Sequence, residues 1–131
     1  MIEIYVDGAC SGNPGKTGVG YLIYKDGKTL KKGSVALGVQ TNNFAEYMAL
    51  IFSLVDAMSL GETNCKVYSD SQLLCEQIKG NYKVKNNNIV SLFILAKTII
   101  SKFNRFEIEH VRREKNQEAD KLAKKAVGFL E

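Results

Sequence analysis

The sequence predicts a single α/β domain in which three strands precede the first helix. Apolar and polar residues alternate through much of residues 2–37, as in strands with one buried face, and apolar residues recur at helical spacing after residue 41. The length agrees, because 131 residues with 45% hydrophobic content suffice for one compact domain with a buried core. We expect one domain over residues 1–131 with the element order βββαβααβα.

The first three strands should form an antiparallel meander. In the opening strand, residues 2–7, apolar side chains alternate with Tyr5 and with acidic residues, so the two sets lie on opposite faces. Residues 18–38 then divide into two strands at Asp26-Gly27, since an Asp-Gly pair is a strong signal for a tight hairpin.

Helices and two short strands make up the rest of the chain. Cap-type residues and apolar spacing predict a long helix from Thr41-Asn42-Asn43 to near Gly61, a short helix over 71–79 closed by Gly80, a helix over 88–103, and a last helix within 116–130. The short strands are residues 65–70 and 106–111.

Two strands share a pattern that places two carboxylates together. EIYVD and KVYSD each carry Tyr two positions before a final Asp, so Asp7 and Asp70 stand in the same relation to their strands. A long helix separates the strands, which favours a crossover connection and a parallel pairing. The two carboxylates would then face each other at strand ends, where open α/β sheets bind ligands. Because like charges repel, a cation or a retained proton should accompany them.

Glu46 and Asp120 are the other candidate carboxylates. Glu46 is expected in the first turn of the long helix among apolar residues, where the alternative is a favourable interaction with the helix dipole. Asp120 is expected inside the last helix beside apolar residues. Aspartate is a poor helix former at such a position, so helix propensity does not explain why this residue is present.

Composition and charge limit the classes of function. Residues 66–131 carry thirteen Lys/Arg against eight Asp/Glu, so this half is the expected face for a polyanion unless it is only a solvated surface. Three separated cysteines and one histidine fit neither a disulfide framework nor a zinc site. No apolar run is long enough to span a bilayer and the start is unlike a signal peptide, so we expect a cytoplasmic protein without membrane contact.

Gly15-Lys16-Thr17 matches the end of a nucleotide-binding phosphate loop. However, Cys10 stands where that loop needs its first glycine, and strand-forming residues follow where it needs a helix. The segment is therefore not expected to bind a nucleotide.

Four motifs occur in order along the whole chain: DGACSGNPG, TNNFAEYMAL, YSDSQLL and REKNQEADKLAKKA. With the predicted element order, they resemble ribonuclease H of type 1. The resemblance implies a ribonuclease H-like fold, in which helices flank a five-stranded mixed sheet of order 3-2-1-4-5. It places the four family carboxylates at Asp7, Glu46, Asp70 and Asp120.

The resemblance implies an endoribonuclease that cuts the RNA strand of RNA–DNA hybrids and leaves 5′-phosphate and 3′-hydroxyl ends. Two Mg²⁺ ions, which Mn²⁺ can replace, would be bound by the four carboxylates, with Asp7 as the bridging ligand. We expect a monomer whose partner is the hybrid, with double-stranded RNA as an alternative partner.

The resemblance also implies a set of contacts to the substrate. Backbone groups of Gly8, Cys10 and Ser11 and the side chains of Asn13, Asn42, Asn43 and Gln72 would meet 2′-hydroxyls in the minor groove. Thr41 with Asn13 or Asn42 would hold a phosphate of the DNA strand. For Asn43, a turn or cap role is the alternative.

The chain departs from many family members in two places. The loop that carries a histidine before the last carboxylate is shortened, and Arg113 in the pattern R-x-x-N-x-x-x-D resembles the residue of the histidine-lacking branch. We expect Arg113 to act in catalysis and His110 to be structural or only near the site. The basic handle is also missing, since only Lys83 and Lys85 remain in that region.

Two other functions fit fewer of these observations. A hybrid-binding or double-stranded RNA-binding module with weak catalysis would gain nothing from four carboxylates that face a polyanion. A DNA-acting relative of the fold, such as an integrase or exonuclease, would not need side chains suited to 2′-hydroxyls.

Overall fold

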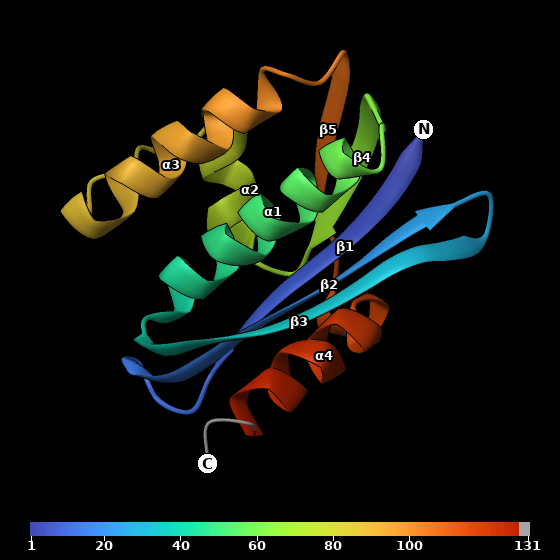
Figure 1. Ribbon diagram of the computed structural model, residues 1–131. Helices are drawn as coiled ribbons and strands as arrows, with labels where there is room; N and C mark the ends of the chain where they lie inside the picture. The colour runs from blue at the N-terminus through green and yellow to red at the C-terminus, as the bar shows by residue number, and fades with distance from the viewer. Residues whose placement is uncertain (129–131) are drawn as a thin grey trace.

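The computed structural model describes residues 1–128 and contains one five-stranded sheet with helices on both faces (Figure 1). The strands are β1 (Ile2–Cys10), β2 (Gly15–Lys25), β3 (Lys28–Gln40), β4 (Asn64–Ser69) and β5 (Arg105–His110). The helices are α1 (Asn42–Ser59), α2 (Gln72–Lys79), α3 (Asn87–Ile100) and α4 (Gln117–Gly128), with a 3-10 turn at Arg113–Lys115. The predicted element order is confirmed, and residues 129–130 of the last predicted helix lie outside the described residues.

The sheet has the order β3-β2-β1-β4-β5, as the family resemblance implies. β1 pairs with β2 antiparallel and with β4 parallel, so the antiparallel and parallel halves meet at β1. The register sets Tyr5 opposite Tyr68. The two strands with the shared pattern are therefore parallel neighbours in matching register.

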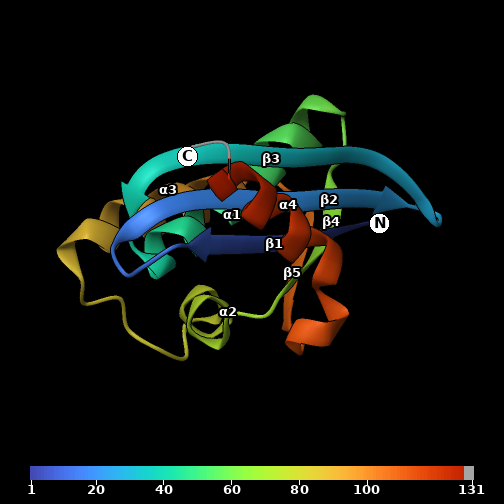
Figure 2. The ribbon, with the colours of Figure 1, turned by 90° about the horizontal axis from the view of Figure 1, so that it is seen from below.

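The main core lies between the sheet and helices α1, α2 and α3. Figure 2 shows α4 in front of the sheet, with α1 and α3 behind it. The alternating apolar side chains of β1 are fully buried there, and Tyr47 and Leu50 of α1 pack into the same cluster. Thr41 caps α1 by accepting a hydrogen bond from the Phe44 backbone, and Gly80 closes α2 in the left-handed conformation. These capping predictions are confirmed.

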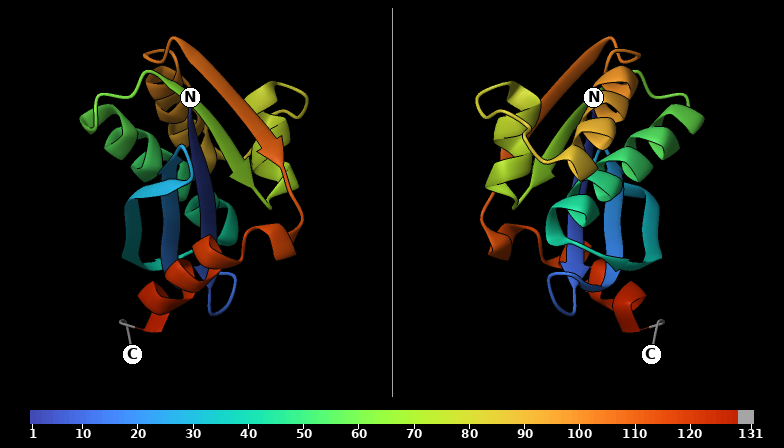
Figure 3. Two further views of the ribbon diagram at one scale, coloured as in Figure 1. Left: turned by 90° about the vertical axis from the view of Figure 1, so that its right-hand side faces the viewer. Right: turned by 90° about the vertical axis from the view of Figure 1, so that its left-hand side faces the viewer.

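Helix α4 lies directly on the backbone of β2 (Figure 3). A Cβ atom at Gly20 would stand 2.3 Å from the Ala119 carbonyl oxygen, and one at Gly18 would stand 2.5 Å from that of Ala123. Glycine on the strand and alanine on the helix therefore set how deeply α4 sits, and this depth positions the Asp120 backbone.

Three predicted boundaries are wrong. β2 begins at Gly15, three residues before the predicted start. β1 continues three residues past Asp7, because its pairing with β2 extends to Cys10–Thr17 after its pairing with β4 has ended. α3 ends at Ile100, since Ser101 already caps it. None of the helices within residues 1–128 is long and apolar enough to cross a membrane.

Candidate active site

Three elements bring three carboxylates together where the two halves of the sheet meet. Asp7 is the first residue of β1 beyond the parallel pairing with β4, and Asp70 directly follows β4. Glu46 reaches the same place from α1. One oxygen from each of the three carboxylates lies within 4.8 Å of the others.

Gly8 fixes the position of Glu46. The Gly8 backbone N–H donates to Glu46 Oε1 at 2.8 Å, and a Cβ atom on Gly8 would stand 2.6 Å from the Ala45 Cβ atom. Helix α1 thus rests on the β1 backbone at this point. Glu46 is the fifth residue of α1, in its second turn, so the expectation of a first-turn position is wrong and the helix dipole does not explain this glutamate.

Asp120 completes the cluster from α4. It lies in the first turn of the helix, where an acidic side chain is favourable, so the expectation of a mid-helix aspartate is wrong. It shares a hydrogen bond with Asp7, and its Oδ2 lies 2.9 Å from Lys124 Nζ. Burial acts to raise the pKa of Asp120, but the hydrogen bonds with Lys124 and Asp7 and the charges of Lys124 and Arg113 together lower it.

Burial and mutual repulsion make two of these carboxyls hard to ionise. Burial first, and then the charges of Glu46 and Asp70, raise the pKa of Asp7 to about 9. Burial and the charge of Asp70 raise the pKa of Glu46 to about 8, against the effects of the Gly8 hydrogen bond and Arg113. A divalent cation would replace the retained protons, and a donor set made only of carboxylate oxygens suits a hard cation.

The carboxylates line a cleft of about 520 Å³ with basic residues on its wall. Arg113 lines the cleft, and its charge lowers the pKa of both Glu46 and Asp120. His110 Nε2 lies 3.3 Å from the backbone carbonyl oxygen of Asp70. Arg113 is therefore placed beside the carboxylates. His110 also lines the cleft, where its ring lies against the backbone of Asp70.

Only some of the predicted substrate-binding residues line this cleft. Gly8, Cys10 and Asn42 line it, and Asn13 is held nearby because its Oδ1 accepts from the Asn42 backbone at 3.0 Å. The others, which do not line the cleft, are Ser11, Thr41, Asn43 and Gln72.

Several predicted groups already have partners within the protein. The backbone N–H of Gly8 donates to Glu46, and that of Ser11 donates to the Lys16 carbonyl. Asn43 does not cap α1, and its buried Oδ1 has no hydrogen-bond partner.

Sequence reasoning missed the roles of Asn116 and Lys124. Asn116 is 1% exposed, and its Nδ2 donates to the Val6 carbonyl at 2.8 Å, which ties the start of α4 to the residue before Asp7. The Asn of R-x-x-N-x-x-x-D was the available signal. For Lys124, the signal was its spacing of four residues from Asp120, which places two side chains on one helix face.

Comparisons with known proteins agree with this arrangement. The family model described as reverse transcriptase-like matches residues 5–126. The bifunctional protein Rv2228c of Mycobacterium tuberculosis is 41% identical over 96% of this chain, but over only 35% of its own length. A ribonuclease H of Actinobacillus pleuropneumoniae is 32% identical over 95% of this chain and 88% of its own. The structure of LC11-RNase H1 in complex with RNA/DNA hybrid has a TM-score of 0.94 and 36% identity, and the match covers 99% of both chains.

The fold and the site together define a class, that of nuclease-like domains in which carboxylates gather at the middle of a mixed five-stranded sheet. The chain belongs to the ribonuclease H family. It spans about a third of the length of the mycobacterial relative.

Proposed function

We propose that this protein is a metal-dependent endoribonuclease that hydrolyses the RNA strand of RNA–DNA hybrids and leaves 5′-phosphate and 3′-hydroxyl ends. The observation that carries the proposal is the convergence of four carboxylates from four separate elements, three of them within 4.8 Å, in one open cleft. A fold tolerates such repulsion where a cation neutralises it. The family membership and the likeness to a hybrid-bound structure support the choice of substrate.

The residues fit a pair of Mg²⁺ ions, with Mn²⁺ able to substitute. Asp7, Glu46, Asp70 and Asp120 would hold the ions, and Asp7, the central member, would bridge them. When bound, the ions supply an activated water and stabilise the leaving oxygen. Gly8 holds the Glu46 carboxylate in place, and Lys124 holds one of the two oxygens of Asp120.

The loops around the cleft supply the groups for substrate recognition. Asn42 and the Asn13 loop stand together beside the carboxylates, and amides can both donate to and accept from a 2′-hydroxyl. Arg113 can approach the scissile phosphate or Asp120 from the wall of the cleft. We further propose that residues 1–131 form one catalytic domain that acts as a monomer in the cytoplasm.

The test is cleavage of labelled RNA–DNA, RNA–RNA and DNA–DNA duplexes, with Mg²⁺ and with a chelator. We expect cutting of the RNA strand of the hybrid only when the metal is present. Cleavage of DNA–DNA would favour the DNA-acting alternative. Tight hybrid binding without cleavage, under Mg²⁺ or Mn²⁺, would favour the binding module.

A further inference from the structure

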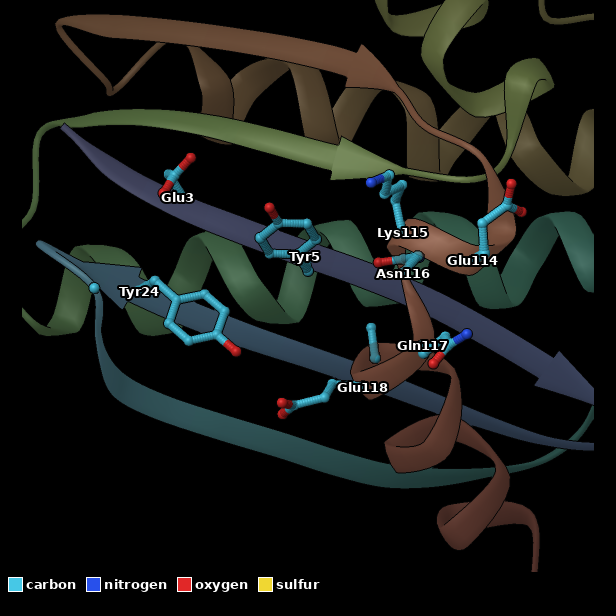
Figure 4. Close-up of a pocket in the computed structure, with 10 residues that line it drawn as sticks. Glu3, Tyr5, Tyr24, Glu114, Lys115, Asn116, Gln117 and Glu118 are labelled. Atoms are coloured by element: carbon cyan, nitrogen blue, oxygen red, sulfur yellow. The ribbon is translucent and has the colours of Figure 1, made fainter.

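A second cleft lies on the α4 face of the sheet (Figure 4). It has a volume of about 440 Å³, within the range of small-ligand sites, and lies between β1, β2 and residues 114–119. Two aromatic rings line it, together with three carboxylates and one ammonium group. These residues are Tyr5, Tyr24, Glu3, Glu114, Glu118 and Lys115.

The aromatic wall is part of a row that crosses three strands. Tyr5 stacks on Tyr68 with ring centroids 4.8 Å apart, and it meets Tyr24 edge to face at 5.9 Å. The Tyr68 hydroxyl donates to Glu3 Oε2 at 3.1 Å, which holds a carboxylate against the row. The rings are therefore fixed by one another before any ligand arrives.

One end of this row already binds an ammonium group. Lys66 Nζ lies 5.3 Å from the centroid of the Tyr68 ring and 2.9 Å from Glu109 Oε1, so it sits between an aromatic ring and a carboxylate. At the other end, Tyr24 lines the cleft together with Glu118, and neither Tyr5 nor Tyr24 has a cation over its ring within residues 1–128.

The carboxylates of the cleft are only partly neutralised by the protein. Glu118 has Lys32 at 3.7 Å, with both side chains more than half exposed, and such pairs are weak. Figure 4 shows Lys115 on the β4 side of the cleft, beyond Tyr5. The cleft therefore keeps an excess of negative charge next to open aromatic rings.

Asn116 adds an acceptor to the floor of this cleft. The residue is 1% exposed, its Nδ2 donates to the Val6 carbonyl, and its Oδ1 has no hydrogen-bond partner. Figure 4 shows the side-chain oxygen turned toward Tyr5. An unpaired carbonyl dipole aimed in this direction favours a positive group in the cleft.

We propose that this cleft binds an alkylammonium or guanidinium group, from either a free polyamine or a Lys or Arg side chain of a peptide. Aromatic rings with adjacent carboxylates suit such cations, which combine positive charge with N–H donors. Residues 114–119 separate the cleft from Asp120, so this site is distinct from the carboxylate cluster.

The test is a nuclear magnetic resonance titration of the ¹⁵N-labelled protein, with Mg²⁺ present to occupy the carboxylate cluster. The probes are spermidine, N-acetyl-lysine amide and N-acetyl-arginine amide, with N-acetyl-citrulline amide as the neutral match for arginine. We expect saturable shifts of the amides of Tyr24, Gly27 and Gln117 with the cations alone. Saturation by spermidine only would assign a free polyamine, and saturation by the capped amino acids would assign a peptide side chain.

Variants separate this site from general attraction of cations. Tyr24→Leu and Glu118→Gln should each weaken binding about three- to fivefold, as expected for loss of one ring or charge contact at a partly exposed site. Lys115→Gln should strengthen binding, and Tyr82→Leu, at an exposed tyrosine outside the cleft, should leave it unchanged. The proposal is overturned if no probe saturates, if citrulline binds equally, or if both Tyr24→Leu and Glu118→Gln bind like the wild type.

Discussion

Replacing Asp7 by asparagine tests the cluster through the stability of the metal-free protein. The pKa of this carboxyl is about 9 in the fold against an ordinary value of 3.8, so the folded state keeps a proton that the unfolded chain releases. The stability of the metal-free wild type should therefore fall as pH rises from about 4 to about 9. It falls by at most about 1.4 kcal/mol per pH unit for one retained proton, or about 4 kcal/mol between about pH 5 and pH 8.

Asp7→Asn removes this titration, because an amide carries no proton that the unfolded chain would release. The variant should be more stable than the wild type at about pH 8 in a chelator, with a clearly flatter dependence on pH. It should also cleave no hybrid, because the proposed bridging ligand is gone. Urea unfolding followed by circular dichroism, at several pH values, measures the stability difference, and a hybrid cleavage assay measures activity.

Asp26→Asn is the matched control. It makes the same chemical change in the exposed hairpin turn, at a positive φ of 52° that asparagine tolerates, and should leave the pH dependence as in the wild type. If Asp7→Asn and the wild type lose stability equally with rising pH, the carboxyl does not hold the proton. Strong residual cleavage at saturating Mg²⁺ would exclude Asp7 as the bridging ligand.

Three further predictions concern the surroundings of the carboxylates. Gly8→Ala should destabilise the protein by about 1–3 kcal/mol and reduce cleavage, because the added Cβ atom would clash with the Cβ atom of Ala45. If the variant is as stable as the wild type in urea unfolding, this clash does not occur. Arg113→Ala should reduce turnover severely and His110→Ala only slightly, with no inflection in rate near pH 6.5 of the kind an imidazole would produce; the opposite ranking would assign the role to His110. A hybrid with a single ribonucleotide should be cut far more slowly than one with a run of four, and equal rates would refute recognition of several 2′-hydroxyls.

Local patterns in the sequence were sufficient for most of the fold. The alternation in β1, the Asp26-Gly27 turn and the Thr41 cap each act over a few residues, so each could be predicted from neighbours in the chain. The shared pattern that ends in Asp7 and Asp70 also predicted a contact between distant parts of the chain. Two strands joined by a crossover connection lie parallel, so residues at matching positions come side by side.

The details of the site could not be predicted in the same way. Asp120 was expected in mid-helix, yet α4 begins only three residues before it, because the 3-10 turn and Asn116 take up the chain after β5. The ion pair of Asp120 with Lys124 had a signal in its spacing, but spacing does not show which of several lysines turns toward the carboxylate.

The sequence by itself determined the order of the elements, the two apolar faces and the four carboxylates that the family resemblance selects. Only the tertiary structure decided how close the carboxylates come and which of them keep protons. Close packing of Gly8 on α1 and of Gly20 on α4 sets those separations, through contacts between residues far apart in the chain. Burial and repulsion depend on these distances, so the pKa of Asp7 is a property of the assembled fold and not of any segment.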